Sequence, residues 1–430
     1  MSRILIVGGG YIGLYTARHL ERLLPANAHQ LVMVSPENHM TYQPFLPEVA
    51  SGLIDPRAVV VPLRSVLRRT ELVVGEVERI EVEGRSARIR LPDGRPRDEP
   101  FDVAVIGAGS WSRTLPIPGL AEYAVWFKTL PEAIWLRNRV LAQLDAASEA
   151  ADDEERRTAL GFVFVGAGFA GIEAIGELED FARAALAPYP GAMAADMRWV
   201  MVEASDRILP ELDPALATYA ADRLRERGIE IRTDTKLVSI EDGLVRLSDG
   251  SSIAAGTVVW TAGVRASPLA SASGLPVDGR GRVRVDRTLR VEGIDGLWAA
   301  GDVAAVPDPD EPSGSSPPTA QHALRQAKRL AENISADLDG RPPQPFRYRN
   351  KGMLCSLGHY QGVADPLGVR IRGFPAWFLH RTYHLFYMPT LGRKVRIALD
   401  WTVALLFPRD LAQLGSLEHP RDAFRRSAGS

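Results

Sequence analysis

Two stretches of the chain repeat the same order of apolar and polar positions. The first has an apolar, β-branched run over residues 3–7, then three glycines, then apolar residues at helical spacing from Tyr11 to Leu24. The second, about 158 residues later, has an apolar run over 162–165, a glycine-rich turn and helical spacing over 172–186. Each stretch is expected to fold as a strand, a tight turn and a helix. So long a period predicts two separate units and not an array of small repeats.

Shorter apolar runs surround these stretches. Strands are expected over residues 73–82, 87–91, 101–106, 198–203, 229–240, 244–247, 257–261 and 297–300. A helix is expected over 214–227, a linker or the start of an exposed helix over the charged run 151–158, and a loop over 308–318. This alternation predicts an α/β fold: two Rossmann-like nucleotide-binding domains followed by a C-terminal membrane-interface or dimerisation segment.

Both glycine turns show the spacing G-x-G-x-x-G between a strand and a helix. The residues concerned are Gly8, Gly10, Tyr11, Ile12 and Gly13 in the first turn and Gly166, Gly168, Phe169 and Gly171 in the second. The first glycine permits the tight turn, the second lets a pyrophosphate approach the backbone, and the third allows close packing of helix on strand. One such pattern can be an ordinary turn, but two in this context favour two dinucleotide sites.

The residue at the end of the second strand of each unit is expected to contact the ribose of the bound dinucleotide. In the second unit this is Glu203, whose carboxylate would bind both ribose hydroxyls and repel a 2′-phosphate, which favours NADH over NADPH. The nearby Arg207 weakens this preference, and an ordinary surface glutamate is the alternative. In the first unit the expected carboxylate is missing, so either Ser35 makes a weaker ribose contact or Glu37 reaches back.

A further strand ends in Gly301 and Asp302. In flavoproteins this arrangement places an aspartate near the ribityl and phosphate part of FAD, and the next helix points its N-terminus at the isoalloxazine. With the two glycine turns, it predicts FAD in the first site and NADH in the second. We expect the FAD-binding domain at residues 1–112 and 261–340, the NADH-binding domain at 113–260 and the C-terminal segment at 341–430.

The amino-acid composition excludes several kinds of partner and reaction. Of the 430 residues, 46% are hydrophobic and 24% charged, and the formal net charge of −2 gives no indication of nucleic-acid binding. The single cysteine, Cys355, leaves no protein dithiol, so reduction of lipoamide or glutathione is excluded. The eight histidines show no metal-ligand spacing, and we expect no metal.

With these motifs the chain resembles the type II NADH:quinone oxidoreductases, a family of pyridine-nucleotide FAD flavoproteins. The resemblance extends over residues 3–408 and includes the stretches 38–52, 259–264, 297–303 and 317–323. In the family the segment that contains Gln43 and Pro44 lies against the flavin. The matched stretches also imply cofactor contacts at Ala108, Gly109, Gly263 and Ala320.

The resemblance implies two catalytic residues, Glu173 and Gln321, and Arg325 is a third candidate at a position where the chain departs from the family. Glu173 matches a glutamate that faces the flavin and the nicotinamide and handles protons or quinone; a solvated residue in a first helical turn is the alternative. The quinone-side pattern Ala-Gln-x-Ala-x-Gln is matched at Gln321, but Arg325 replaces its last glutamine. Gln326, one residue later, cannot face the same way on a helix. The arginine could instead steer a quinone carbonyl or an anionic acceptor.

The C-terminal segment interleaves aromatic residues with arginines over residues 370–409. This pattern is typical of helices in a membrane interface, where basic side chains meet anionic head groups; a dimer interface or a packed cap is the alternative. The chain shows no signal segment and no run of eighteen apolar residues. We expect a cytoplasmic protein, peripheral on the inner face of the cell membrane, and a homodimer is compatible with the pattern.

The sequence thus predicts an FAD-dependent enzyme that takes a hydride from NADH and passes two electrons to a quinone or another small-molecule acceptor. One alternative is a soluble NAD(P)H-dependent flavoprotein reductase with a non-quinone acceptor, which Arg325 and the polar tail 411–430 favour. The other is an NADH-linked redox-sensing protein whose output is partner binding.

Overall fold

The computed structural model describes residues 2–189, 193–308 and 314–413, and the chain divides into two compact units. Unit 1 comprises the chain up to Tyr42, Val60–Arg113 and Gly263–Lys351. Unit 2 comprises Gln43–Val59, Thr114–Ala262 and the chain from Gly352 on. Each unit is therefore assembled from three segments that lie far apart in the sequence.

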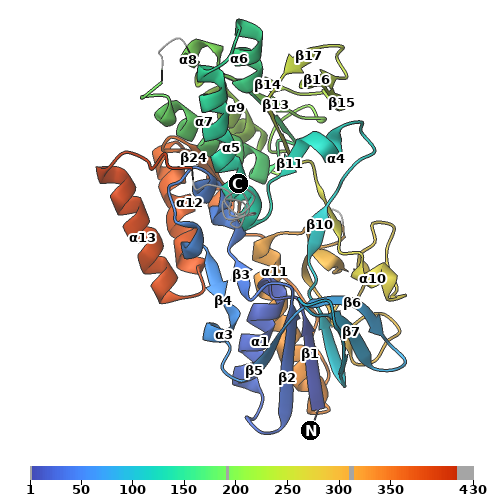
Figure 1. Cartoon of the computed structure of the whole chain (residues 1–430). Coiled ribbons are helices and arrows are strands. Elements are labelled where there is room, and N and C mark those ends of the chain that lie inside the picture. The colour runs from blue at the N-terminus through green and yellow to red at the C-terminus, as the bar shows by residue number, and fades with distance from the viewer. Residues whose placement is uncertain (1, 190–192, 309–313, 414–430) are drawn as a thin grey trace, which may run out of the picture. The chain divides into compact units, whose positions relative to one another are not determined.

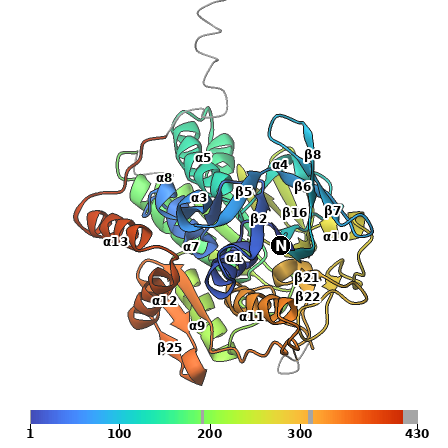
Figure 2. The ribbon, with the colours of Figure 1, turned by 90° about the horizontal axis from the view of Figure 1, so that it is seen from below.

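Unit 1 is organised around a five-stranded parallel sheet. In spatial order its strands are β21 (Leu297–Ala299), β9 (Val103–Ile106), β1 (Ser2–Val7), β2 (His29–Ser35) and β5 (Thr70–Val74). The last four residues of β1 are all buried, as expected for a continuous apolar run in a central parallel strand. Helices α1 (Tyr11–Leu23) and α11 (Ala320–Leu338) lie side by side (Figures 1 and 2), and the hydroxyl of Thr16 donates to the carbonyl oxygen of Ala327 at 3.4 Å.

Unit 2 repeats this plan. Its parallel strands are, in spatial order, β11 (Ala124–Trp126), β18 (Thr257–Trp260), β12 (Gly161–Val165), β13 (Arg198–Val202) and β14 (Ile229–Arg232). The buried rings of Phe162 and Trp199 on neighbouring strands stack with centroids 4.3 Å apart. Helix α7 (Phe169–Ala185) follows β12, and α9 (Pro214–Glu226) follows β13. The predicted α/β fold class with two Rossmann-like sheets is confirmed.

Each parallel sheet is accompanied by a small antiparallel sheet. These sheets consist of β6 (Glu76–Glu81), β7 (Ser86–Arg90) and β8 (Pro96–Pro100) in unit 1, and of β15 (Leu237–Glu241), β16 (Leu244–Leu247) and β17 (Ser252–Ala254) in unit 2. The single strand predicted over residues 73–82 is wrong, because the chain leaves the parallel sheet at Gly75. A Cβ there would lie 2.9 Å from the carbonyl oxygen of Arg90, so glycine is required at this crossing.

The structure defines two further segments. Gly301 and Asp302 open the 3-10 turn η3 (Gly301–Val303), and the helix that follows them is α11. The charged run near residue 155 is a complete short helix, α6 (Asp153–Ala159). Its N-cap Asp152 accepts a hydrogen bond from the N–H of Glu155 at 2.8 Å, which explains why so polar a segment is helical.

The C-terminal part of unit 2 adds a three-stranded antiparallel sheet and two helices (Figure 1). The elements are β23 (Leu354–Gly358), β24 (Gln361–Ala364), β25 (Ile371–Arg372), α12 (Phe374–Tyr387) and α13 (Leu391–Leu406). Within the described parts of the chain, no helix is both long and apolar enough to cross a membrane. Most of the polar tail noted in the sequence, residues 414–430, lies outside the described residues.

Replacement of Gly176 by alanine is expected to lower the melting temperature of the protein by several degrees. A Cβ at Gly176 in α7 would lie 2.4 Å from the carbonyl oxygen of Leu357 in β23, where backbone meets backbone. Overpacking of this kind costs about 1–3 kcal/mol. Thermal unfolding of the purified variant measures the loss.

Gly392→Ala is the matched control, because a Cβ at this glycine of α13 would meet no described atom within 4 Å. Alanine favours a helix by up to about 1 kcal/mol over glycine, so this variant should unfold at the same temperature as the wild type or a higher one. Equal melting temperatures for the two variants would contradict the close packing of α7 on β23.

Candidate functional site

The first glycine turn joins β1 to α1 and leaves little room for side chains. A Cβ at Gly8, whose φ is +99°, would lie 2.4 Å from the carbonyl oxygen of Gly107, and one at Gly13 would lie 1.8 Å from that of Gly8. A Cβ at Gly10 would meet no described atom within 4 Å, so this side of the turn is open. Gly10 is the N-cap of α1, and no side chain caps the N–H groups that begin at Tyr11 and Ile12 in the described structure.

The second glycine turn, between β12 and α7, has the same geometry. A Cβ at Gly166, whose φ is +107°, would lie 2.7 Å from the backbone nitrogen of Ala262, and one at Gly171 would lie 2.1 Å from the carbonyl oxygen of Gly166. Gly168 again faces open space and is the N-cap of α7, which begins at Phe169 without a side-chain cap among the described residues.

Both turns fit the diphosphate of a dinucleotide. In each turn, no side chain of the described residues caps the N–H groups at the positive end of the helix, and a glycine leaves space for the phosphates on that side. In unit 1 the hydroxyl of Tyr11 is also buried and has no hydrogen-bond partner in the part of the chain that the structure describes. It is therefore available to a bound molecule beside the first turn.

The residues predicted to contact ribose lie at the carboxyl ends of their strands. Glu203 follows β13; its Oε2 accepts the N–H of Ala167 at 2.7 Å and its Oε1 that of Ser205 at 2.9 Å, so the carboxylate is held against the glycine turn. Arg207 donates instead to the carbonyl oxygen of Pro210 at 2.7 Å. In unit 1, Ser35 is buried at the end of β2, whereas Glu37 is exposed.

The remaining residues predicted for FAD in unit 1 lie along a two-stranded ribbon of β10 (Ser110–Ser112) and β19 (Val264–Ala266). The hydroxyl of Ser110 donates to Asp302 at 2.6 Å, and both residues line a cavity of about 110 Å³ together with Gly301. Ala108 and Gly109 precede one end of the ribbon, and Gly263 lies at the other end. Ala320 is the first residue of α11.

The two residues predicted for the quinone side lie one turn apart at the start of α11. The hydroxyl of Tyr348 donates to Oε1 of Gln321 at 2.9 Å, and the guanidinium carbon of Arg325 lies 4.8 Å from the centroid of the Tyr348 ring. Gln326 faces the other way, as predicted: it is buried, and its Oε1 accepts the N–H of Gly301 at 2.8 Å. Sequence reasoning gave Gln326 no role, whereas the structure shows that it holds the Gly301 turn.

Glu173 lies in the first turns of α7, in unit 2. Its side chain is 8% exposed, so the alternative of a solvated glutamate is wrong. Oε1 accepts the N–H of Ser356 at 3.2 Å and lies 2.9 Å from Nε2 of His380. Unit 2 also contains Gln43 and Pro44, in the 3-10 turn η1 (Gln43–Phe45), where the Gln43 amide donates to the carbonyl oxygen of Lys128 at 3.3 Å. Gln321 and Arg325, by contrast, belong to unit 1.

Comparisons with known proteins agree on one family. The pyridine nucleotide-disulphide oxidoreductase family matches residues 2–327. The chain is 31% identical over 422 residues to the type II NADH:quinone oxidoreductase Ndh of Mycobacterium tuberculosis, covering 95% of this chain and 89% of that one. It is 33% identical over 387 residues to the type II NADH:quinone oxidoreductase of Staphylococcus epidermidis, covering 88% and 93%. This chain belongs to the type II NADH:quinone oxidoreductase family.

A solved structure agrees with this family's fold. NDH2 of Plasmodium falciparum in complex with NADH superposes on the chain with a TM-score of 0.90 and 17% sequence identity, over 96% of this chain and 99% of that one. The predicted resemblance to type II NADH:quinone oxidoreductases is confirmed.

In this member of the family, sequence reasoning missed the polar residues around Glu173. Glu177, Ser356 and His380 are all buried in unit 2 within one or two contacts of Glu173. One signal was available: Glu177 follows Glu173 by four residues, which places both on one face of a helix. Ser356 and His380 come from segments more than a hundred residues away, and no local pattern reports such a contact.

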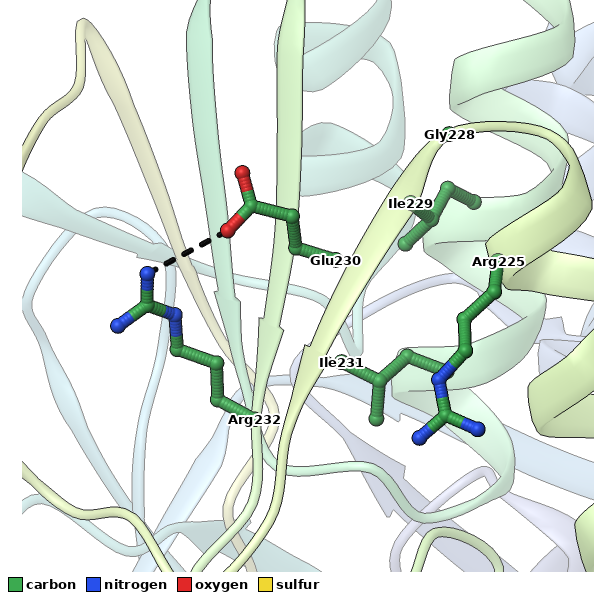
Figure 3. Close-up of a pocket in the computed structure, with 6 residues that line it drawn as sticks. All are labelled: Arg225, Gly228, Ile229, Glu230, Ile231 and Arg232. Atoms are coloured by element: carbon green, nitrogen blue, oxygen red, sulfur yellow. Dashed lines mark hydrogen bonds and ion pairs between the residues drawn. The ribbon is translucent and has the colours of Figure 1, made fainter.

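A shallow depression of about 470 Å³ lies along the edge strand β14 of the same sheet (Figure 3). It is lined by Arg225 and residues 228–232, and Glu230 in it is paired with Arg232 at 3.4 Å and with Arg198 at 2.6 Å. Its lining includes none of the site residues predicted for this member of the family.

Glu203→Gln is expected to raise the ratio of kcat/KM for NADPH to that for NADH by about tenfold or more, because one charge repulsion of about 1.4 kcal/mol is then removed. The amide can still accept the N–H of Ala167, which isolates the effect of charge. Steady-state kinetics with both nucleotides measure the ratio. Asp206→Asn, at an exposed neighbouring residue, is the control, and an equal rise in both variants would contradict the assignment of Glu203.

Proposed function

We propose that this protein oxidises NADH with bound FAD and passes two electrons to a quinone, and that unit 1 holds FAD and unit 2 holds NADH. One observation carries this proposal: in each parallel sheet the central strand leads into a glycine turn and then a helix. No side chain among the described residues caps that helix, and a glycine leaves open space at its N-terminus. The relatives named type II NADH:quinone oxidoreductase support the reaction. The Gly301–Asp302 turn favours FAD in unit 1, and the carboxylate of Glu203 favours NADH in unit 2. The domain boundaries expected from the sequence, 1–112 and 261–340 for FAD and 113–260 for NADH, are part of this proposal, although residues 43–59 belong to unit 2.

The overall reaction converts NADH, a quinone and a proton into NAD⁺ and a quinol. FAD, when bound, supplies the chemistry that accepts a hydride and releases two electrons. The chain has to bind both nucleotides, position them, and deliver the proton. Glu173 is the candidate proton donor, because it is a buried carboxyl and lies 2.9 Å from Nε2 of His380.

Gln321 and Arg325 are the proposed contacts for the acceptor. Arg325 is held over the ring of Tyr348 and donates to the carbonyl oxygen of Gln321 at 3.1 Å, so its position is fixed by neighbours on its own unit. A guanidinium presents several donors in a planar fork and can bind a quinone carbonyl oxygen. Replacement of the family's glutamine by this arginine therefore keeps a hydrogen-bond donor and adds a positive charge.

The C-terminal helices are the proposed membrane surface, on the inner face of the cell membrane. Apolar residues on α13 are between 49% and 77% exposed and recur every three or four positions: Leu391, Val395, Leu399, Val403 and Leu406. Such a stripe suits insertion into the boundary of head groups and acyl chains. A homodimer that covers the same stripe is the competing arrangement.

The basic residues of this segment divide into two groups, apart from Arg372, whose guanidinium carbon lies 5.4 Å from the centroid of the Tyr219 ring. Arg370 is paired with Asp213, Arg381 with Glu48 and Arg409 with Asp180, so these three bind carboxylates of their own unit and not lipid, contrary to the expectation for the whole segment. Arg393, Lys394 and Arg396 remain at the start of α13 for anionic head groups.

Glu173→Gln is expected to leave reduction by NADH within about twofold of the wild type and to slow reoxidation by quinone about 10²-fold or more, the usual contribution of a general acid. Anaerobic stopped-flow mixing with NADH and then with a short-chain quinone follows both steps through the flavin absorbance. Glu122→Gln, an exposed residue in α4 (Leu120–Tyr123), is the matched control. Wild-type protein that is reduced quickly by NADH but reoxidised slowly by every quinone tested would contradict the proposed function.

Leu399→Asp is expected to weaken binding to vesicles that contain anionic lipid about tenfold or more, because one leucine buried in the membrane contributes about 1.5–3 kcal/mol. Vesicle co-sedimentation measures the change. Leu23→Asp, at the end of α1, is the control, since Leu23 is 47% exposed and Leu399 58%. If Leu399→Asp converts a dimer to a monomer and leaves vesicle binding unchanged, the stripe is a subunit interface and the membrane proposal is wrong.

A further inference from the structure

A second group of ionisable side chains lies in unit 2 close to Glu173. Glu48 on α2 (Leu46–Ala50) is 2% exposed, and Glu177 on α7 is 1% exposed. The guanidinium of Arg381 on α12 lies 3.3 Å from Oε2 of Glu48, and the indole N–H of Trp401 donates to the same oxygen at 2.5 Å. Oε1 of Glu48 is buried and has no hydrogen-bond partner among the described residues. It is therefore an acceptor position that a proton can occupy.

Two serine hydroxyls hold Glu177. Ser51 donates to its Oε2 at 3.3 Å, and Ser356 donates to its Oε1 at 3.2 Å. The backbone N–H of Ser356 donates to Glu173, also at 3.2 Å. Ser356 on β23 therefore contacts both Glu173 and Glu177, which lie one helical turn apart on α7.

Most of the other charges around α7 are already compensated. Asp180 is paired with Arg409, and the ring of His359 lies 3.2 Å from it. On the same helix Glu179 is paired with Arg183 and Arg227.

In the described part of the chain, ionisable groups on the elements packed against α7 add no further charge next to Glu48 and Glu177. Arg137 of α5 (Leu130–Ser148) lies over the ring of Phe181 and donates to the carbonyl oxygens of Asp410 and Ala412. On α12, burial and the neighbouring His380 hold the pKa of His384 well below its ordinary value, which keeps that ring neutral. On β23, burial raises the pKa of the Cys355 thiol, so it carries no charge.

Glu48 and Glu177 lie on the packed helices α2 and α7, and the hydroxyl of Ser51 contacts both residues, at 3.2 Å from the carbonyl oxygen of Glu48 and 3.3 Å from Oε2 of Glu177. The guanidinium of Arg381 is paired with Glu48, whereas that of Arg409 is paired with Asp180. Burial raises the pKa of Glu177, and the charge of Glu48 raises it further, against the opposing effect of Arg381 and Arg409. Two ionised carboxyls beside one cation would leave a net negative charge out of water, which is costly and favours a bound proton.

We propose that Glu48 and Glu177 share one proton and that this buried acid pair sets the proton affinity of Glu173. With its proton, the pair together with Arg381 is neutral. Without it, an extra negative charge lies one helical turn from Glu173 and strengthens the hold of Glu173 on its own proton. Glu177 is thus a positioning residue that acts through Glu173, and this second half of the proposal rests on the proposed role of Glu173 in quinone reduction.

Infrared spectra of the full-length, FAD-loaded wild type and of its glutamine variants, compared as difference spectra, test whether the two residues share a proton. At neutral pH the wild type is expected to show a protonated-carboxyl C=O band that both Glu177→Gln and Glu48→Gln remove. In each variant the one carboxyl that remains is balanced by Arg381 and ionises. Glu122→Gln, at an exposed residue, is expected to leave the band unchanged.

Two infrared outcomes overturn the sharing of a proton. A band that persists in Glu48→Gln and is lost in Glu177→Gln means that Glu177 holds the proton alone. A band unchanged in both variants means that neither residue holds it.

The pH dependence of thermal unfolding gives a second test that needs no quinone. Because the pKa of Glu177 is raised in the folded state, the native protein binds more protons than the unfolded chain, and stability falls as pH rises through the folded value. As pH rises from about 5 to about 8, the melting temperature should therefore fall less in both glutamine variants than in the wild type. Equal losses in all three proteins would overturn the proposal, whereas a failure of the proposed quinone reaction would not affect this measurement.

The link to Glu173 is tested by the pH profile of quinone-dependent kcat. The alkaline limb is expected to shift to lower pH in both glutamine variants, because Glu173 then lacks the extra negative charge that holds its proton at high pH. Reduction by NADH in stopped flow is expected to keep its wild-type rate. Loss of the infrared band with an unmoved alkaline limb would overturn the second half of the proposal.

Discussion

The close approach of Gly13 to the carbonyl oxygen of Gly8 is the constraint on which unit 1 depends, and Gly171 and Gly166 impose it again in unit 2. A side chain at either position would separate the helix from the strand that precedes it. Because glycine has no side chain, the helix starts directly at the carboxyl edge of the sheet, and no side chain in the described part of the chain caps its first N–H groups. The geometry that closes the turn therefore also forms an anion-binding site, and a diphosphate can bind there.

The two units differ more at the ends of their strands than in their sheets. Both sheets have five parallel strands with the glycine turn after the central one; the outer strand is β21, the last of the five in the chain, in unit 1 and β11, the first of the five, in unit 2. The strand next to the centre ends in Ser35 in one unit and leads into Glu203 in the other. Unit 1 then adds the turn at Gly301, which Gln326 holds from α11 through a hydrogen bond of 2.8 Å. One architecture thus supports two cofactor sites through a few polar groups at one edge.

The sequence predicted the features that local patterns determine. Both strand–glycine–helix stretches, the α/β class and the family could be found because their signals lie within thirty residues or in short motifs. The break at Gly75 was missed, because the apolar run continues through a glycine whose role depends on contact with Arg90. The start of the helix that follows Asp302 could not be placed, because the Gly-Asp strand leads first into a 3-10 turn and the helix begins only at Ala320. The neighbours of Glu173, such as His380, are set by tertiary contacts that no single stretch encodes.

The buried charges of unit 2 are not needed to join its helices. Apolar and aromatic contacts already do so, since the ring of Phe45 lies 5.8 Å from that of Trp401 and 6.0 Å from that of His384. Replacing a buried ion pair by well-packed apolar residues is often neutral or stabilising, because desolvation offsets most of the attraction between the charges. Desolvation of Glu48, Glu177 and Arg381 is therefore a cost that well-packed apolar side chains in the same space would avoid. This cost gives a physical reason to assign the cluster to proton chemistry and not to packing.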